Sequence, residues 1–430
     1  MTTVALPVKG EERYVSSEAR IISDARRRGM GIALVLISLL MLFPFGVDVS
    51  RHDQTTFFLS TGTSVNISPL TFGVRGVSIG LAIACAALGV ILFATGRFGR
   101  VFVIFSIGIA MFLWSFLAWA ARGQTLNLVG VIGVTLISAI PIIFGSLSGV
   151  MCERAGVINI AIEGQFLIGA FLAAMVASAS NDLWLGLFVG ALGGGILGAL
   201  LAFLSIRYSA DQIIVGVVIV AFATGLTNYL TLTLLAPYQN TLNAGYVFGN
   251  WAIPLLDKIP IIGPDVFDQN IFVYMAIVLL VTIQTGLFRT RWGLRVRAVG
   301  EHPEAAETVG IKVLRVRYRN VILGGVIAGI GGASFTIGSI GEFSAGMTAG
   351  LGFVALAAMI FGRWRPYGGL VAALLFGFAN SLQSTLAVLN VPINSNFLTM
   401  APYVITIAVV SGLVGRVRAP AYDGKPYRPQ

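Results

Sequence analysis

The 430-residue chain has few of the residues from which most enzyme active sites are built. Charged residues make up 11% of it, and it contains only two cysteines and two histidines. Cys85 and Cys152 lie in or beside apolar runs, so the sequence predicts neither a disulfide framework nor a thiolate metal site. His52 and His302 both fall in loops, which excludes a histidine proton relay and an HExxH zinc site.

Two catalytic motifs are also missing from the chain. It has no GxxxxGK[ST] sequence, so it cannot hold ATP phosphates in a P-loop, and it has no GxSxG nucleophile elbow. We therefore expect no catalytic residues, no metal and no cofactor. A membrane-embedded enzyme acting on lipid-linked substrates is disfavoured for the same reason.

Long apolar runs fill most of the sequence. Hydrophobic residues make up 57% of the chain, the mean hydropathy is +0.89, and each membrane span needs roughly 20 mostly apolar residues. This pattern predicts an all-α polytopic membrane protein with about 10–12 transmembrane helices. The expected spans lie near residues 30–49, 76–95, 101–120, 128–149, 156–177, 184–205, 212–235, 270–288, 320–340, 347–362, 367–388 and 398–415.

The net charge of +10 is better explained by the positive-inside bias of membrane proteins than by a nucleic-acid partner. The apolar run 30–49 follows a basic tail and is too long for a cleaved signal peptide, so we interpret it as a retained first span. Threading the spans alternately then places every Lys and Arg on the cytoplasmic side except Arg51, Arg75, Arg122 and Lys258. Both termini are therefore expected in the cytoplasm.

The same threading predicts the organisation of the chain. A cytoplasmic tail (1–29) precedes N-terminal transmembrane segments (30–127), a core (128–415) and a second cytoplasmic tail (416–430). Within the core, about four spans lie on each side of the single span 270–288, and such an odd separator gives an inverted repeat. The outer loops 50–75 and 236–269 either receive an extracytoplasmic partner or only connect spans.

The most polar part of the core is the cytoplasmic loop 289–319, which carries eight Arg and Lys residues around the segment PEAAETVG. Pro303 suits a first helical position, Glu304 suits the positive end of the helix dipole, and Gly310 suits the position after the last turn. Residues 303–309 are therefore predicted to form about two turns of helix. An isolated helix this short is marginal in water, so we expect it to dock on another subunit beneath the membrane.

Polar residues inside apolar spans are candidates for a substrate path. Asn159 and Glu163 would share one face if the backbone between them were helical. A carboxylate in the membrane is costly, so Glu163 should face the protein interior, where it either borders the path or braces a broken helix through backbone N–H groups. Further candidates, for which interhelical hydrogen bonding or simple packing is the alternative, are Asn228, Phe343, Asn380 and Gln383.

Three stretches carry a resemblance to a known family. They are ERAGVINIAIEGQ (153–165), GLRVRAVGEHPEAAETVGI (293–311) and GMTAGLGFVALAAMIFGRWRP (346–366). With their spacing, over roughly residues 128–415, the chain resembles permease subunits of ATP-binding-cassette importers for ribose and other simple sugars, branched-chain amino acids and nucleosides. Sugar permeases tend to carry a Gly-Ile-Asp-Leu-Ser type of sequence where this chain has Gly-Val-Ile-Asn-Ile at 156–160, so nucleoside permeases are the nearest group.

The resemblance implies that this chain is a transport subunit of the bacterial cytoplasmic (inner) membrane, in contact with lipid, and that ATP is hydrolysed on a separate ATPase subunit. It also implies a second permease copy or homologue, an extracytoplasmic substrate-binding lipoprotein and a small-molecule substrate. The resemblance assigns ATPase coupling to Pro303, Glu304, Ala305, Ala306 and Gly310. Family cores have about ten spans, so the first two spans would be an N-terminal addition.

Two alternatives to nucleoside import remain open at this point. Within the same family, the substrate is a simple sugar or a branched-chain amino acid. Outside it, an ion-coupled secondary transporter would need a membrane-embedded carboxylate, a role that Glu163 or Asp211 would have to fill. Such a transporter would leave the basic loop and its docking helix without a purpose.

Overall fold

The computed structural model describes residues 24–59, 68–94, 101–256, 259, 263–389, 400 and 418–428. Within these residues, ten helices are long and apolar enough to cross a membrane, which confirms the predicted all-α polytopic class. The expected span 347–362 contains only the short apolar helix Leu351–Phe361. The expected span 398–415 lies outside the described residues except for Met400.

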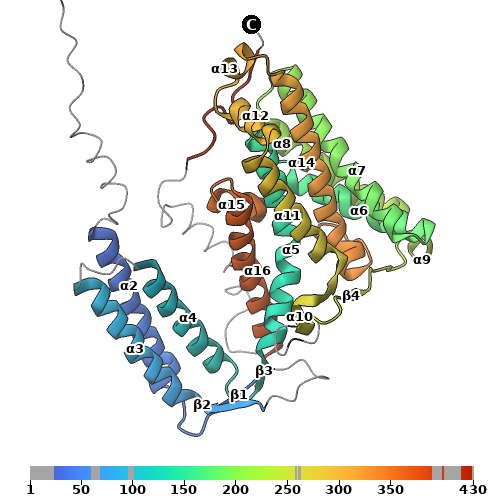
Figure 1. Cartoon of the computed structure of the whole chain (residues 1–430). Coiled ribbons are helices and arrows are strands. Elements are labelled where there is room, and N and C mark those ends of the chain that lie inside the picture. The colour runs from blue at the N-terminus through green and yellow to red at the C-terminus, as the bar shows by residue number, and fades with distance from the viewer. Residues whose placement is uncertain are drawn as a thin grey trace, which may run out of the picture. The chain divides into compact units, whose positions relative to one another are not determined.

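Helices dominate the described part of the chain, and its short strands lie in the loops (Figure 1). The helices are α2 (Asp24–Leu42), α3 (Val74–Ala94), α4 (Val101–Ala120), α5 (Leu128–Glu153), α6 (Ile162–Ser180), α7 (Leu183–Ala202), α8 (Gln212–Leu230), α9 (Gln239–Leu242), α10 (Gly263–Phe267), α11 (Ile271–Arg289), α12 (Arg291–Glu301), α13 (Pro303–Thr308), α14 (Val313–Phe335), α15 (Leu351–Phe361) and α16 (Pro366–Val388). The strands are β1 (Gln54–Phe58), β2 (Leu70–Gly73), β3 (Thr125–Asn127), β4 (Asn250–Ala252) and β5 (Asp268–Asn270). Single π-helical turns follow α2, α7, α8 and α14.

Short polar side chains cap the N-termini of several long helices. Asp182 caps α7 by accepting hydrogen bonds from the backbone N–H groups of Trp184 (2.9 Å) and Leu185 (3.3 Å). Asp211 caps α8 in the same way, through Ile213 (2.9 Å) and Ile214 (3.1 Å). Such caps satisfy N–H groups that the first turn leaves without partners. Asp211 is exposed at this position, so it is a helix cap rather than an embedded carboxylate.

Two span boundaries differ from the sequence prediction for identifiable reasons. The span expected from residue 156 begins as helix only at Ile162, because residues 156–161 form a turn and an extended stretch that starts at Gly156, whose φ is +84°. A positive φ suits glycine and breaks a helix. The span expected from residue 320 begins at Val313, because its first turns carry arginines that hydropathy alone assigns to the loop.

The described residues form two compact units. Unit 1 comprises the described residues of 24–59 and 66–128 with Leu389, and it contains α2, α3 and α4. Its small sheet has the order β2-β1-β3, in which β1 is antiparallel to β2 and parallel to β3. Its core includes Leu34, Met41 and Cys85, so the N-terminal segments have a hydrophobic core of their own.

Unit 2 comprises the described residues of 129–388 and the segment 418–428. Figure 1 shows α12 and α13 at one end of its long helices, and β4 and α10 near the other end. We call the end with α12, α13 and residues 418–428 the basic end, because seven of the eight Arg and Lys residues of 289–319 are exposed or partly exposed there. The end with β4, β5 and α10 is the opposite end.

Helices α6, α7 and α14 of unit 2 pack against one another through glycine. A Cβ added at Gly194 of α7 would lie 2.5 Å from the Cα of Gly329 on α14, and one at Gly198 would lie 2.9 Å from the carbonyl oxygen of Val321. A Cβ at Gly190 would lie 2.7 Å from the carbonyl oxygen of Gly169 on α6. Small residues at such positions let helix backbones approach closely, which is how helices associate in lipid.

Candidate functional site

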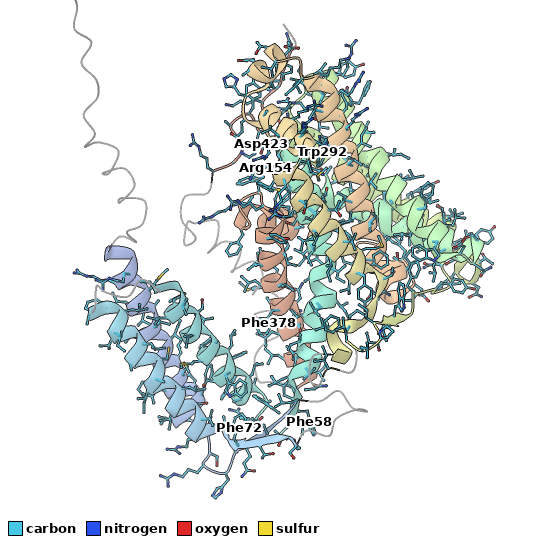
Figure 2. All side chains as sticks on the ribbon, viewed as in Figure 1. Phe58, Phe72, Arg154, Trp292, Phe378 and Asp423 are labelled. Carbon is cyan, nitrogen blue, oxygen red and sulfur yellow. The ribbon has the colours of Figure 1, made fainter. Side chains whose placement is uncertain are left out.

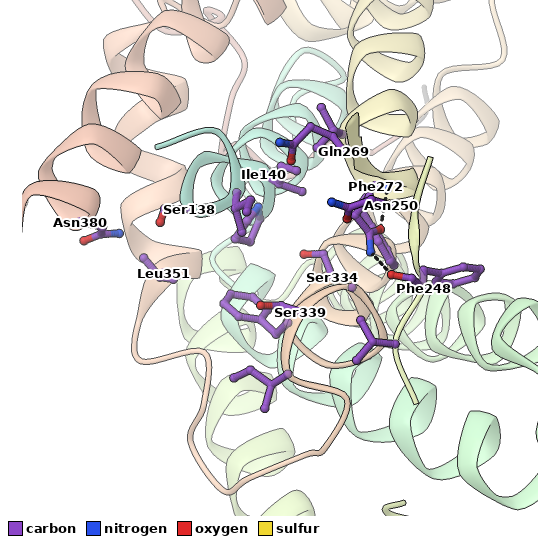
Figure 3. Close-up of a pocket in the computed structure, with 18 residues that line it drawn as sticks. Ser138, Ile140, Phe248, Asn250, Gln269, Phe272, Ser334, Ser339, Leu351 and Asn380 are labelled. Carbon is purple, nitrogen blue, oxygen red and sulfur yellow. Dashed lines mark hydrogen bonds between the residues drawn. The ribbon is translucent and has the colours of Figure 1, made fainter. Parts of the chain in front are cut away.

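A cavity of about 410 Å³ opens in unit 2 toward the opposite end (Figure 3). Its walls come from α5, residues 247–250, β5, the start of α11, the end of α14 with the π-helical turn after it, the start of α15, and α16. These segments are far apart in the sequence. The volume lies within the ordinary range of small-molecule sites, about 300–1,000 Å³.

The cavity has a neutral lining. None of the described residues that line it is charged. Three aromatic rings, those of Phe248, Phe272 and Phe335, contribute apolar surface. The polar side chains are Ser138, Asn250, Gln269, Asn270, Ser334, Ser339 and Asn380. Such a lining can bind a flat neutral ring by stacking and can hydrogen-bond hydroxyl, carbonyl or amine groups.

Two irregular helices shape the walls. Pro141 lies inside α5 and has no backbone N–H, so the carbonyl of Ile137 lacks its usual intrahelical donor, and both residues line the cavity. On the other side, α14 passes into the π-helical turn Thr336–Ile340, which also contributes to the lining. Single π-helical turns are frequent at functional sites. The sequence analysis did not predict that these two segments would line a cavity. The only signal was Pro141, a proline inside an apolar run.

The wall formed by residues 247–270 is fixed to α11. Asn270 donates a hydrogen bond from Nδ2 to the carbonyl of Phe248 (2.7 Å) and accepts one from the N–H of Phe272 (3.2 Å). The hydroxyl of Tyr274 lies 2.8 Å from the carbonyl oxygen of Trp251 and 2.9 Å from that of Phe267. These contacts hold a polar loop in a defined position against the cavity.

Glu163 lies away from the cavity lining, in the first turn of α6, and is 6% exposed. Its carboxylate accepts hydrogen bonds from Thr348 Oγ1 (2.6 Å) and from the backbone N–H groups of Gly350 (2.9 Å) and Gly352 (2.7 Å). These donors lie at the start of α15, where the first N–H groups lack intrahelical partners. Glu163 therefore has the geometry of a brace for a broken helix.

Asn159 is fully buried in the stretch before α6 and does not share a helical face with Glu163. Its Nδ2 group lies within hydrogen-bonding distance of Ser148 Oγ (3.2 Å), Cys152 Sγ (3.5 Å) and Gln165 Oε1 (3.1 Å). In this position the Asn159 side chain ties the end of α5 to the start of α6.

The other predicted path residues are dispersed. Asn380 lines the cavity, whereas Gln383 lies half-buried one turn further along α16. Asn228 is exposed on α8. Phe343 is 3% exposed and packs edge-on against Phe171, with ring centroids 5.3 Å apart. The substrate-path assignment of these residues stays a prediction.

The basic end contains the predicted docking helix. Helix α13 runs over Pro303–Thr308 with Pro303 in its first turn, and Gly310 follows its C-cap with φ +82°, as the sequence indicates. Pro303 and Ala306 are buried, whereas Glu304, Ala305 and Gly310 are exposed. The helix therefore has an exposed outer surface.

Arg154, labelled in Figure 2, connects α12 to the residues that follow α15. Its Nε donates to the carbonyl of Trp364 (2.9 Å), its NH2 group donates to that of Arg363 (3.3 Å), and its NH1 group lies 4.0 Å from the Glu301 carboxylate. Burial lowers the pKa of Arg154 from its ordinary value, and Glu301 opposes that shift. Beside it, Glu153 accepts a hydrogen bond from Trp364 Nε1 (2.5 Å). The family-like stretches 153–165 and 346–366 thus contact each other at Arg154, as they also do at Glu163.

Comparison with known proteins gives one family. The model described as "Branched-chain amino acid transport system / permease component" matches residues 131–410. The chain is 39% identical over 303 residues to the nucleoside ABC transporter permease protein NupC of Lactococcus lactis, covering 68% of this chain and 94% of that protein. It is 37% identical over 308 residues to the guanosine ABC transporter permease protein NupQ of Bacillus subtilis (69% and 96%).

A third relative is named for a different substrate. The chain is 32% identical over 318 residues to the putative glucose ABC transporter permease protein TsgC13 of Haloferax volcanii, covering 67% of this chain and 93% of that protein. No solved structure matches the chain.

Proposed function

We propose that the substrate of this chain is a nucleoside. The chain belongs to the branched-chain amino acid transport system permease family. It is a permease subunit of an ATP-binding-cassette importer in the cytoplasmic membrane. Such a subunit transports and is not itself an enzyme. The chemistry of the cavity lining is the observation that carries the substrate proposal.

A nucleoside combines a flat heterocycle with a hydroxylated sugar and has no net charge. The half-buried rings of Phe248 and Phe335 offer apolar surface for the base, and the serine and asparagine side chains offer partners for the sugar hydroxyls and the edge of the base. A zwitterionic amino acid would instead bring two charges, which are costly to bury without partners. The neutral lining therefore favours a nucleoside or a sugar over a branched-chain amino acid.

The aromatic residues of the cavity lining favour a nucleoside over a simple sugar. A simple sugar has no aromatic face, whereas aromatic stacking contributes about 0.5–1.5 kcal/mol per ring pair beyond area burial. The relatives named for nucleosides and guanosine are 39% and 37% identical to the chain, and the one named for glucose is 32% identical. A glucose-type substrate is the second candidate, since that relative supports it.

We further propose that α13 docks a separate ATPase subunit and that the basic end faces the cytoplasm. The exposed surface of Glu304 and Ala305, and the surrounding arginines, support this assignment. A second permease copy or homologue and an extracytoplasmic substrate-binding lipoprotein complete the proposed importer. The ATPase moves α13, and the helices of unit 2 carry that motion to the cavity.

The test is uptake of radiolabelled guanosine, uridine and glucose into cells with and without this chain. Asn380→Ala removes a polar group from the cavity lining and should raise the KM for the transported nucleoside about tenfold, the value of one to two hydrogen bonds. Asn240→Ala, at an exposed position in α9, is the matched control. If cells with this chain took up glucose but no nucleoside, the substrate would be a sugar rather than a nucleoside.

A further inference from the structure

The C-terminal segment 418–428 lies across the basic end and contacts α12 and α13. The N–H of Tyr422 donates to the carbonyl of Gly300 (2.9 Å), and its hydroxyl donates to Glu304 (3.4 Å). The hydroxyl of Tyr427 donates to Glu307. Both side-chain contacts reach the predicted docking helix, and the labels of Asp423 and Arg154 in Figure 2 mark this region.

The same segment holds the start of α14 through Arg317. This arginine is 1% exposed, and its NH1 group donates to the carbonyl of Lys425 (3.2 Å). Its guanidinium lies over the rings of Tyr422 and Tyr427, 5.6 Å from each centroid, within the range of cation–π attraction. Two tyrosines thus contact a buried cation with their rings and α13 with their hydroxyls.

A third set of contacts reaches the stretch between α5 and α6. A Cβ at Gly156 would lie 2.9 Å from Arg317 NH2 and 3.2 Å from the carbonyl oxygen of Tyr422. A Cβ at Gly424, where φ is +75°, would lie 2.7 Å from Ile158 Cδ1. The segment is therefore packed tightly against the end of α5 as well.

We propose that residues 418–428 are a positioning segment, which holds α13 against α5 and α14 so that movement of α13 reaches the substrate cavity. The proposal rests on the proposed function, in which α13 docks the ATPase. Helix α13 has six residues and buries only Pro303 and Ala306, so its own packing against the rest of unit 2 is small. Tyr427 adds its ring to the small apolar cluster that contains Ala306.

The two helices held by the segment both reach the cavity. Arg317 lies near the start of α14, and Ser334 and Phe335 at the end of that helix line the cavity. Glu153 ends α5, and Ser138 in the earlier part of α5 lines the cavity too. A shift imposed on the segment at the basic end therefore acts on both walls through continuous helix.

The first test measures α13 directly, by hydrogen–deuterium exchange of the full chain in lipid nanodiscs. The double variant Tyr422→Phe, Tyr427→Phe keeps both rings over Arg317 and removes only the hydroxyl contacts to α13. Exchange of the amides of residues 304–309 should become at least fivefold faster, whereas Tyr208→Phe, at an exposed position, should leave it unchanged. Unchanged exchange in the double variant would overturn the proposal, whatever the substrate is.

The second test measures coupling in the complete importer reconstituted in vesicles. The double variant should hydrolyse ATP at a rate close to that of the wild type and import at least fivefold less nucleoside per ATP. Tyr208→Phe should match the wild type in both. An unchanged ratio of import to hydrolysis would refute the positioning role. A wild-type complex that imports no nucleoside would instead refute the proposed substrate, and the exchange experiment would still decide on the segment.

Discussion

The brace at Glu163 gives a prediction that separates two roles for a buried carboxylate. In Glu163→Gln, one carboxylate oxygen becomes an NH2 group of almost the same shape. The amide oxygen can keep the contacts with Thr348 and Gly350, but the NH2 group then faces the N–H of Gly352, so two donors meet in a buried place. The substitution therefore breaks one end of the link between α6 and α15 without leaving a cavity.

The cost follows from ordinary hydrogen-bond energies. A charge-assisted bond contributes about 1.5–3 kcal/mol, and a buried donor left without an acceptor costs about 1–3 kcal/mol. Since the effects overlap, we expect the free energy of unfolding of the core to fall by about 2–3 kcal/mol. For a unit of roughly 270 residues, at about 2.1 cal/mol/K of unfolding entropy per residue, this loss lowers Tm by about 4–5 °C.

The two free cysteines supply the assay. Cys85 is buried in unit 1 and Cys152 is buried at the end of α5 in unit 2. With Cys85→Ala as background, a thiol-reactive dye reports unfolding of unit 2 through Cys152. Glu342→Gln, at an exposed position, is the matched control and should leave Tm unchanged. An unchanged Tm in Glu163→Gln together with a large rise in the KM for substrate would refute the brace and restore the substrate-path interpretation.

Two further predictions concern packing and pH. Gly194→Ala should force α7 away from α14 and cost about 1–3 kcal/mol or more, visible as loss of monodisperse protein in size-exclusion chromatography, whereas Gly225→Ala, with open space at its Cβ, should not. Burial raises the pKa of Asp423 to about 7, and contacts with Glu153 and Arg317 oppose that shift. Because this folded-state pKa lies above the ordinary value near 3.8, docking of residues 418–428 should be strongest in acid and weaken as pH rises from about 4 through 7. Limited proteolysis of the segment at pH 5.5 and 8.5 should detect the difference, and Asp423→Asn should abolish it.

Much of the fold follows from local sequence signals. Apolar runs place the spans because a membrane helix must be long and apolar throughout. Pro303 and Gly310 place α13 because each has a backbone preference that acts at its own position. The starts of α6 and α14 were misplaced by several residues because hydropathy reports neither the positive φ of Gly156 nor arginines that continue a helix beyond the membrane.

The candidate site depends on contacts that a single sequence does not contain. The partners of Glu163 lie about 190 residues away, so the carboxylate could be recognised as buried but its role could not be assigned. The cavity is lined by serine, asparagine and phenylalanine side chains, which are common elsewhere in the chain. Only Asn380 was predicted among them, because an amide inside an apolar span is unusual by itself.

The glycine contacts among α6, α7 and α14 determine which part of unit 2 can move. Where backbone lies on backbone, no layer of side chains is available to change rotamer, so the three helices have no second arrangement of similar packing. We therefore expect α6, α7 and α14 to move together as one body. The C-terminal segment is attached to this body through Arg317 of α14, and it also contacts Gly156, just after the end of α5.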